Sequence, residues 1–404
     1  MAKQPPDMSN EMTTTLPKWQ LQVVQVGQSV ATTMILYGQP FYARRALEWS
    51  PATIAMAQIG IGLLTAIGSV LGGRLIERRG CRTSMKLGLV GLIAGSLAGW
   101  LLPEGWNMVT AIVLVAAFQG FVWPAIEAAI TRGEPQHRVQ HLVGMYNLGW
   151  SGGSGFAFFI TTPLMSAFGL RAMFALPLML YLFNLFLLWK VLPDYDSVPD
   201  EHHTVVDSEG VELTPQQRHA FRLLGWLANP MAYVAINVIV TYNPVVAQRI
   251  GVSFATASSW FSLWFYVRMF AFELLRRWSG WHYRPNLLFA AFGMAMLGFA
   301  GMMFAPSLGV HILAQIVFGL SIGLLYQSSL FYSMAGSEEK GTHGGFHESF
   351  IGLGLATGAT LAFVGDRIAP QHPALSVLLV WGLMGVCLAL MWRIARGMSS
   401  SKPS

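Results

Sequence analysis

Charged residues are scarce in this chain of 404 residues. Asp, Glu, Lys and Arg together make up 11% of it, whereas hydrophobic residues make up 54% and the mean hydropathy is +0.50. A soluble globule of this length needs a charged surface, so the composition excludes the soluble class and indicates a membrane protein with many spans. Cysteine is also rare. Of the two present, Cys81 lies in a charged turn and Cys387 inside the last apolar run, so their places among the predicted segments do not suggest a disulfide bond.

Several functional patterns are missing as well. The sequence contains no HExxH or phosphate-loop pattern and no hydrolase-like set of Ser, His and Asp, so we expect neither an enzyme nor a cofactor. Basic residues stand in small groups between apolar segments, and the net charge of +6 therefore does not indicate a nucleic-acid partner. The polar first 20 residues lack a short apolar core with a cleavage site, so we expect no removable signal peptide.

Long apolar runs are what the sequence has instead. Because no water reaches the core of a bilayer, an apolar run of about 20 residues must satisfy its own backbone hydrogen bonds and is predicted to be a helix. We predict an all-α membrane protein with twelve transmembrane helices, at residues 20–43, 51–73, 84–102, 106–130, 142–168, 171–192, 220–248, 253–277, 286–305, 308–335, 345–365 and 374–396.

The distribution of basic residues predicts the orientation of these helices. With the N-terminus inside the cell, most of the 25 lysines and arginines fall on the cytoplasmic side, as expected for cytoplasmic loops. The predicted outer loops then contain only Arg44, Arg45, Arg171, Arg249 and Arg367. An even number of spans places both termini in the cytoplasm. We expect the protein to lie in the plasma membrane, specifically in a bacterial inner membrane.

The chain divides into two similar parts. Residues 193–219 are acidic and too polar to fold alone, so they form a predicted cytoplasmic linker between six-helix bundles at residues 1–192 and 220–404. Gly144-Met145-Tyr146-Asn147 and Gly345-Phe346-His347-Glu348 occupy equivalent places about 200 residues apart. Two repeated halves with a site between them are the architecture of a secondary transporter.

One charged turn carries a resemblance to a known family. The pattern Gly73-x-x-x-Glu77-Arg78-x-Gly80-x-Arg82 resembles the signature between helices 2 and 3 of the major facilitator superfamily. Glu77 replaces the usual aspartate, and Cys81 replaces a basic residue. Together with the span count, the resemblance implies the fold of that superfamily, with two six-helix halves.

The resemblance also implies that this turn helps to close a cytoplasmic gate. Glu77 could accept hydrogen bonds from a helix N-terminus, and Arg78 or Arg82 could pair with Glu348 in the other half. In the simpler alternative, the arginines only set the topology. The predicted gate consists of Gly73, Glu77, Arg78, Gly80, Arg82 and Glu348.

Arg268 is the deepest charge in the predicted spans, about 12 Å from Arg276 at about 1.5 Å per helical residue. It could bind an anionic substrate, or it could pair structurally with Glu273 or with backbone carbonyls. The resemblance implies that spans one, four, seven and ten line the cavity. Polar and aromatic side chains there complete the predicted substrate site: Gln28, Thr32, Tyr37, Gln119, Trp123, Asn237, Tyr242, Tyr326 and Gln327.

Other ionisable residues have simpler explanations. Glu127 lies near the inner end of its span, where it could reach water or Arg132, so proton coupling has no deep carboxylate to support it. His343 and His347 have a metal-binding spacing, but Gly344 and Gly345 between them favour a loop, and we expect no metal site.

We therefore predict a secondary active transporter that moves a small organic solute by alternating access, with protons as the candidate coupling ion. The glycine-rich run from Gly149 to Gly155 resembles an antiporter motif without its proline, which favours export. The alternatives are an uptake carrier for a sugar or an organic anion, and a transporter-like receptor or scaffold that binds a solute without moving it. Nothing in the sequence favours a dimer, so a monomer in the lipid bilayer is expected.

Overall fold

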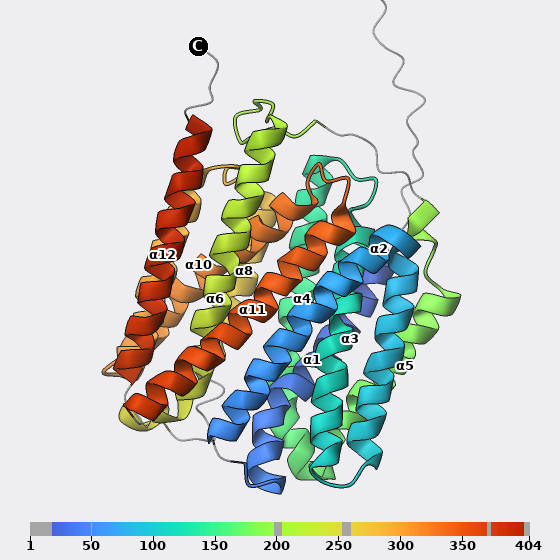
Figure 1. Ribbon diagram of the computed structural model, residues 1–404, viewed down its shortest axis with the longest axis vertical. Helices are drawn as coiled ribbons and strands as arrows, with labels where there is room; N and C mark the ends of the chain where they lie inside the picture. Colours follow the sequence, from blue (N-terminus) through green and yellow to red (C-terminus); the bar gives the residue numbers. More distant parts are fainter. Residues whose placement is uncertain (1–17, 50, 198–203, 253–259, 370–372, 400–404) are drawn as a thin grey trace, which may run out of the picture.

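The computed structural model describes residues 18–49, 51–197, 204–252, 260–369 and 373–399 (Figure 1). Their regular secondary structure is helical apart from one isolated β-bridge between Val206 and Glu212. The helices are α1 (Trp19–Ala46), α2 (Pro51–Leu101), α3 (Trp106–Thr131), α4 (Gln136–Phe168), α5 (Ala172–Lys190), the short 3-10 helix η1 (Tyr195–Ser197), α6 (Pro215–Arg249), α8 (Leu263–Arg277), α9 (Pro285–Phe304), α10 (Leu308–Met334), α11 (Lys340–Ile368) and α12 (Pro373–Ser399).

Helix α2 contains two of the predicted spans. Gly80 separates them, with a φ of 83° that breaks the helical conformation. A glycine adopts this left-handed region without the steric cost that a side chain would add. Within the described ranges, eight helices are long and apolar enough to cross a membrane. The all-helical membrane class is therefore supported, while the count of twelve crossings stays a prediction.

The helices form two groups that meet along one interface. Helices α1 to α5 pack on one another, and α6 and α8 to α12 pack in a second group. The two groups meet mainly where α2 packs on α11 and where α4 packs on α8, and Figure 1 shows α2 and α11 running side by side.

Glycines make the contact between α2 and α11 unusually close. A Cβ atom on Gly62 would lie 2.5 Å from the backbone nitrogen of Ala356, and one on Gly352 would lie 2.6 Å from that of Ala66. Real side chains cannot approach this closely, so the absence of a Cβ lets the two backbones touch. One end of the same contact pairs Gly73 with Gly345.

The part of the acidic linker that the structure describes is packed against both groups of helices. Gln136 of α4 exchanges two hydrogen bonds with the backbone of Val206, at 2.7 and 2.8 Å. Glu209 forms an ion pair of 3.1 Å with Arg284, just before α9. The described part of the linker therefore connects the two groups of helices at one end of the bundle.

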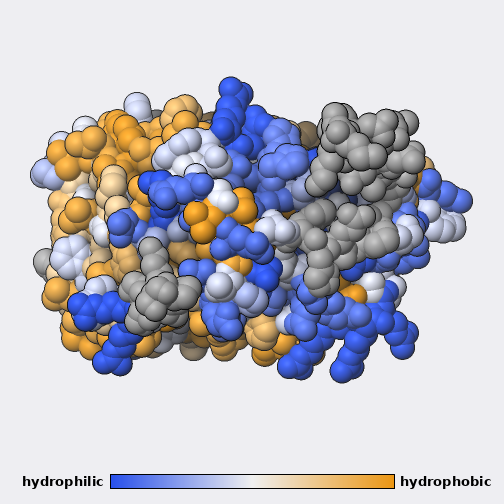
Figure 2. Space-filling view, turned by 90° about the horizontal axis from the view of Figure 1, so that it is seen from above, coloured by the Kyte–Doolittle hydropathy of each residue, from blue (hydrophilic) through white to orange (hydrophobic). Residues whose placement is uncertain are grey.

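Polar and apolar surfaces are separated as a bilayer requires. Figure 2 looks onto the end of the molecule that lies at the top of Figure 1, where α12 ends. Hydrophilic residues gather on this face, and hydrophobic residues follow its left rim. Large side chains such as Phe168 and Trp106 are 76% and 71% exposed. In a bilayer, such side chains would lie against lipid.

Candidate functional site

The turn at Gly80 is held by two carboxylates. Glu77 Oε1 accepts a hydrogen bond of 3.0 Å from the backbone N–H of Thr342, in the first turn of α11. The sequence pointed to such a contact between Glu77 and a helix N-terminus. Because Glu77 and Thr342 belong to different groups of helices, this bond joins the two halves at their polar end.

The second carboxylate, Asp196, was not singled out from the sequence. It accepts hydrogen bonds from the backbone N–H groups of Cys81 and Arg82, at 2.8 and 3.1 Å, and pairs with Arg132 at 3.1 Å. Asp196 thus caps the helical segment that begins after Gly80. Burial and the neighbouring Asp196 carboxylate raise the pKa of the Cys81 thiol, and the backbone N–H of this residue takes part in the cap.

The predicted ion pair between Glu348 and Arg78 or Arg82 is absent from the described part of the chain. The Arg82 guanidinium instead donates to the carbonyl oxygens of Leu188 and Leu192, at 2.7 and 3.0 Å, and Arg78 is exposed. The physical reason is the position of the helix start. Since α11 begins at Lys340, Glu348 lies about two turns inside the bundle, away from the surface turn.

A cavity of about 110 Å³ lies between the two halves. Six of the predicted substrate residues line it: Thr32, Tyr37, Gln119, Trp123, Arg268 and Tyr326. Trp150, Tyr233, Trp264 and Phe265, which the sequence analysis did not select, line it as well, and so does Glu348. Aromatic residues are common in buried helices, so their spacing gave no signal that they face a cavity.

The other predicted substrate residues lie outside the lining and make contacts within the bundle. Gln28 donates to Thr32 Oγ1 at 3.0 Å, and Asn237 donates to the carbonyl of Leu355 at 3.1 Å. The Tyr242 hydroxyl lies 3.1 Å from Ser376 Oγ, and Gln327 accepts a hydrogen bond of 2.7 Å from Asn147. Of these, the bond between Asn147 of α4 and Gln327 of α10 connects the two halves.

Arg268 lies in the wall of the cavity among aromatic rings. Its guanidinium carbon is 4.3 Å from the ring centre of Trp150 and 5.0 Å from those of Trp264 and Phe265. Its exposed fraction is 2%, and its Nε has no hydrogen-bond partner within the described residues. Glu273, the structural partner considered from the sequence, pairs instead with Arg276 at 2.6 Å. The guanidinium is therefore held by cation–π contacts and is free of Glu273.

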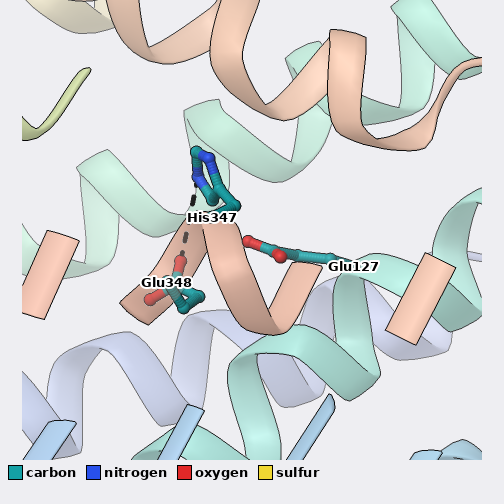
Figure 3. Close-up of side chains that lie close together, drawn as sticks. All are labelled: Glu127, His347 and Glu348. Carbon is teal, nitrogen blue, oxygen red and sulfur yellow. Dashed lines mark ion pairs between the residues drawn. The ribbon is translucent and has the colours of Figure 1, made fainter. Parts of the chain in front are cut away.

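The expectations for Glu127 and the two histidines were wrong. Glu127 is only 1% exposed and accepts a hydrogen bond of 3.2 Å from the Tyr146 hydroxyl. His343 and His347 both lie on helix α11 and not on a loop. The glycines between them serve packing: a Cβ on Gly344 would lie 3.1 Å from a carboxylate oxygen of Glu127. Figure 3 shows Glu127, His347 and Glu348 close together.

These features define the class of the protein. Two groups of apolar helices enclose a cavity that contains a buried charge, and glycine contacts let the groups pack closely, as in a secondary transporter. The family model of the Major Facilitator Superfamily matches residues 23–359. The chain belongs to this superfamily.

Solved structures agree with this fold. The human organic anion transporter MFSD10 is 14% identical, with a TM-score of 0.70 over 93% of this chain and 99% of that one. The proton:xylose symporter XylE, bound to 6-bromo-6-deoxy-D-glucose, is 15% identical with a TM-score of 0.70 over 93% and 95% of the two chains. FucP in the outward conformation is 16% identical with a TM-score of 0.65 over 95% and 98%. No match was found among curated protein sequences.

Proposed function

We propose that this protein carries a small organic anion across the plasma membrane by alternating access. One observation carries the proposal: Arg268 is 2% exposed, lines the central cavity, and forms no ion pair with any carboxylate that the structure describes. A buried charge without a fixed counter-charge is costly. A carboxylate on the substrate would supply that counter-charge whenever the cavity is occupied.

The lining suits an anion with an apolar part. Trp150 and Trp264 flank the guanidinium, and their rings can pack against an aliphatic or aromatic body while Thr32 and Gln119 offer polar contacts. The volume of about 110 Å³ favours a small molecule. MFSD10, one of the similar structures, is described as an organic anion transporter, and this likeness supports the same substrate class.

In this proposal, residues 1–192 rock against residues 220–404 around the cavity, with residues 193–219 as the linker. Twelve helical segments cross the membrane, and both termini lie in the cytoplasm, as the basic residues indicate. The proposed gate on that side would be held closed by the hydrogen bond from Thr342 to Glu77 and by those from Gln140 to the carbonyls of Leu275 and Arg276, at 2.8 and 3.2 Å. Opening toward the cytoplasm must break these contacts.

The decisive experiment compares flux and binding in purified protein. We expect monocarboxylates to raise the melting temperature and to move across reconstituted vesicles. Arg268→Gln should weaken their binding by about 30-fold or more, since a buried charge pair is worth roughly 2–5 kcal/mol. Arg277→Gln is the matched control, because Arg277 lies on the same helix, is 73% exposed and pairs with Glu273.

Three results would contradict the proposal. Unchanged anion flux in the Arg268 variant would show that Arg268 does not bind the anion. Binding of neutral sugars in place of anions would favour the sugar carrier, and tight binding with no flux under any gradient would favour a receptor. Export, proton coupling and the monomeric state stay predictions. The direction of flux tests export, the response of flux to a pH gradient tests proton coupling, and the particle mass in detergent tests the monomeric state.

A further inference from the structure

Three ionisable side chains that share no sequence motif meet between the two halves. Glu127 comes from α3, and His347 and Glu348 come from α11. One potential ligand atom from each residue lies within 4.8 Å of the other two. Their exposed fractions are 1%, 0% and 6%. Figure 3 shows the carboxylate of Glu127 directed toward the other two side chains.

The neighbours of His347 leave one of its nitrogen atoms available. Nδ1 lies 2.9 Å from Ser329 Oγ, so Nδ1–H can donate to that hydroxyl, and Nε2 then carries a lone pair. Nε2 lies 4.0 Å from Glu348 Oε1 and has no hydrogen-bond partner among the residues that the structure describes. It is an unpartnered nitrogen directed at two carboxylates.

Glu127 completes a group of acceptors. Its Oε1 receives the Tyr146 hydroxyl at 3.2 Å, and its Oε2 has no hydrogen-bond partner in the described ranges. Within the same ranges, neither Glu127 nor Glu348 forms an ion pair with a lysine or an arginine. Two carboxylates and a lone-pair nitrogen thus face one another in a buried place. Such a group is stable only when a cation or a proton neutralises it.

We propose that Glu127, His347 and Glu348 bind a divalent transition-metal ion. One imidazole nitrogen with two carboxylate oxygens is a donor set suited to Zn²⁺ and its neighbours, and the nitrogen disfavours Mg²⁺ and Ca²⁺. Ser329 and Tyr146 orient His347 and Glu127, as residues behind metal ligands commonly do. Because Glu348 also lines the central cavity, a remaining coordination position can be filled by water or by a solute.

The metal ion would join α3 of one half to α11 of the other. Its binding should therefore favour the arrangement in which these helices are in contact, which is the arrangement described here. This role does not depend on an anion at Arg268, although Arg268 and Glu348 line the same cavity, and it would hold for any substrate.

The test uses the full-length protein, purified without a histidine tag and stripped with a chelator. Zn²⁺ should bind with a stoichiometry of one and raise the melting temperature, and Co²⁺ should give the visible absorption bands of a four-coordinate site. Glu127→Gln and His347→Gln should each weaken Zn²⁺ binding by about 100-fold or more, since even residues behind the ligands contribute 10- to 100-fold. Ser329→Ala should weaken it by about 10-fold while it keeps all three ligands.

His343→Gln is the matched control. His343 lies one turn earlier on α11, but its ring contacts Arg222 and Ser337, so Zn²⁺ binding should stay unchanged. The proposal is overturned if the unmodified protein binds no Zn²⁺ at any pH from 6 to 8, which would leave a shared proton as the neutralising group. It is equally overturned if His347→Gln binds Zn²⁺ as tightly as the unmodified chain does.

Discussion

A single carboxylate, that of Glu77, joins the turn of α2 to the start of α11. Its bond to the Thr342 N–H places a negative charge at the positive end of the α11 dipole. Glu77 is exposed, so water screens the contact, and its contribution is about 0.5–1 kcal/mol. We predict that Glu77→Gln raises the population open on this side about 2- to 5-fold. Distances between spin labels at the exposed Arg79 and Glu339 would measure it.

The matched control for this variant is Glu104→Gln. Glu104 is exposed in the loop between α2 and α3, so its loss should leave the label distances unchanged. If Glu77→Gln leaves the distances unchanged as well, the bond to Thr342 does not contribute to closure.

Single residues differed in how far the sequence could predict them. Glu77 and Arg268 were identified because one stands in a spaced pattern and the other is an isolated charge in an apolar run. Asp196 was missed because its partner, the N–H of Cys81, is 115 residues away. Glu127 was misplaced for the same reason, since its burial depends on helix α11. Contacts between distant segments leave no local pattern that a sequence reading can use.

At the scale of helices, the approach of α2 to α11 depends on glycine. A Cβ on Gly352 would lie 2.6 Å from backbone atoms of Gly62 and Ala66, and backbone cannot yield as a flexible side chain does. We predict that Gly352→Ala separates the helices at a cost of about 1–3 kcal/mol. The melting temperature should fall, and the distance between labels on α2 and α11 should increase.

Two further glycines provide controls. Gly293→Ala in α9 meets no neighbouring atom within 4 Å and should be tolerated or stabilising by about 0.5–1 kcal/mol. Gly68→Ala clashes with Ala117 inside the first group of helices, so it should lower the melting temperature without changing the distance between the halves. An identical response of Gly352→Ala and Gly68→Ala would contradict a role of Gly352 in the contact between halves.

The boundaries of helices were predicted less well than their existence. The apolar runs located the helices, but α11 begins at Lys340 and not near residue 345. Its first turns contain Gly341, Gly344 and Gly345, a composition typical of a loop. These residues are helical because their small size allows contacts with Ile76, Glu127 and Gly73. Tertiary packing thus overrides the low helix propensity of glycine.

At the scale of the whole molecule, the linker and the helix interface both connect the halves. The linker contributes surface contacts such as the pair between Glu209 and Arg284, whose side chains are 71% and 48% exposed, and exposed pairs contribute little. We predict that cutting the chain at a protease site inserted between Glu209 and Gly210 leaves the halves associated. Both fragments should copurify in detergent and keep the anion affinity of the uncut protein. Separation of the fragments would show that the linker is essential.

Arg268 also has a consequence for energy coupling. A monovalent anion that crosses alone carries one negative charge per cycle, and a membrane potential of 100 mV, negative inside, changes the free energy of that movement by about 2.3 kcal/mol. This drives the anion outward and opposes its entry by roughly 50-fold in concentration. A proton that travelled with the anion, bound at Glu127 or Glu348, would cancel the effect. The protonation of those two carboxylates during the cycle would therefore decide whether the membrane potential acts on the movement of the anion.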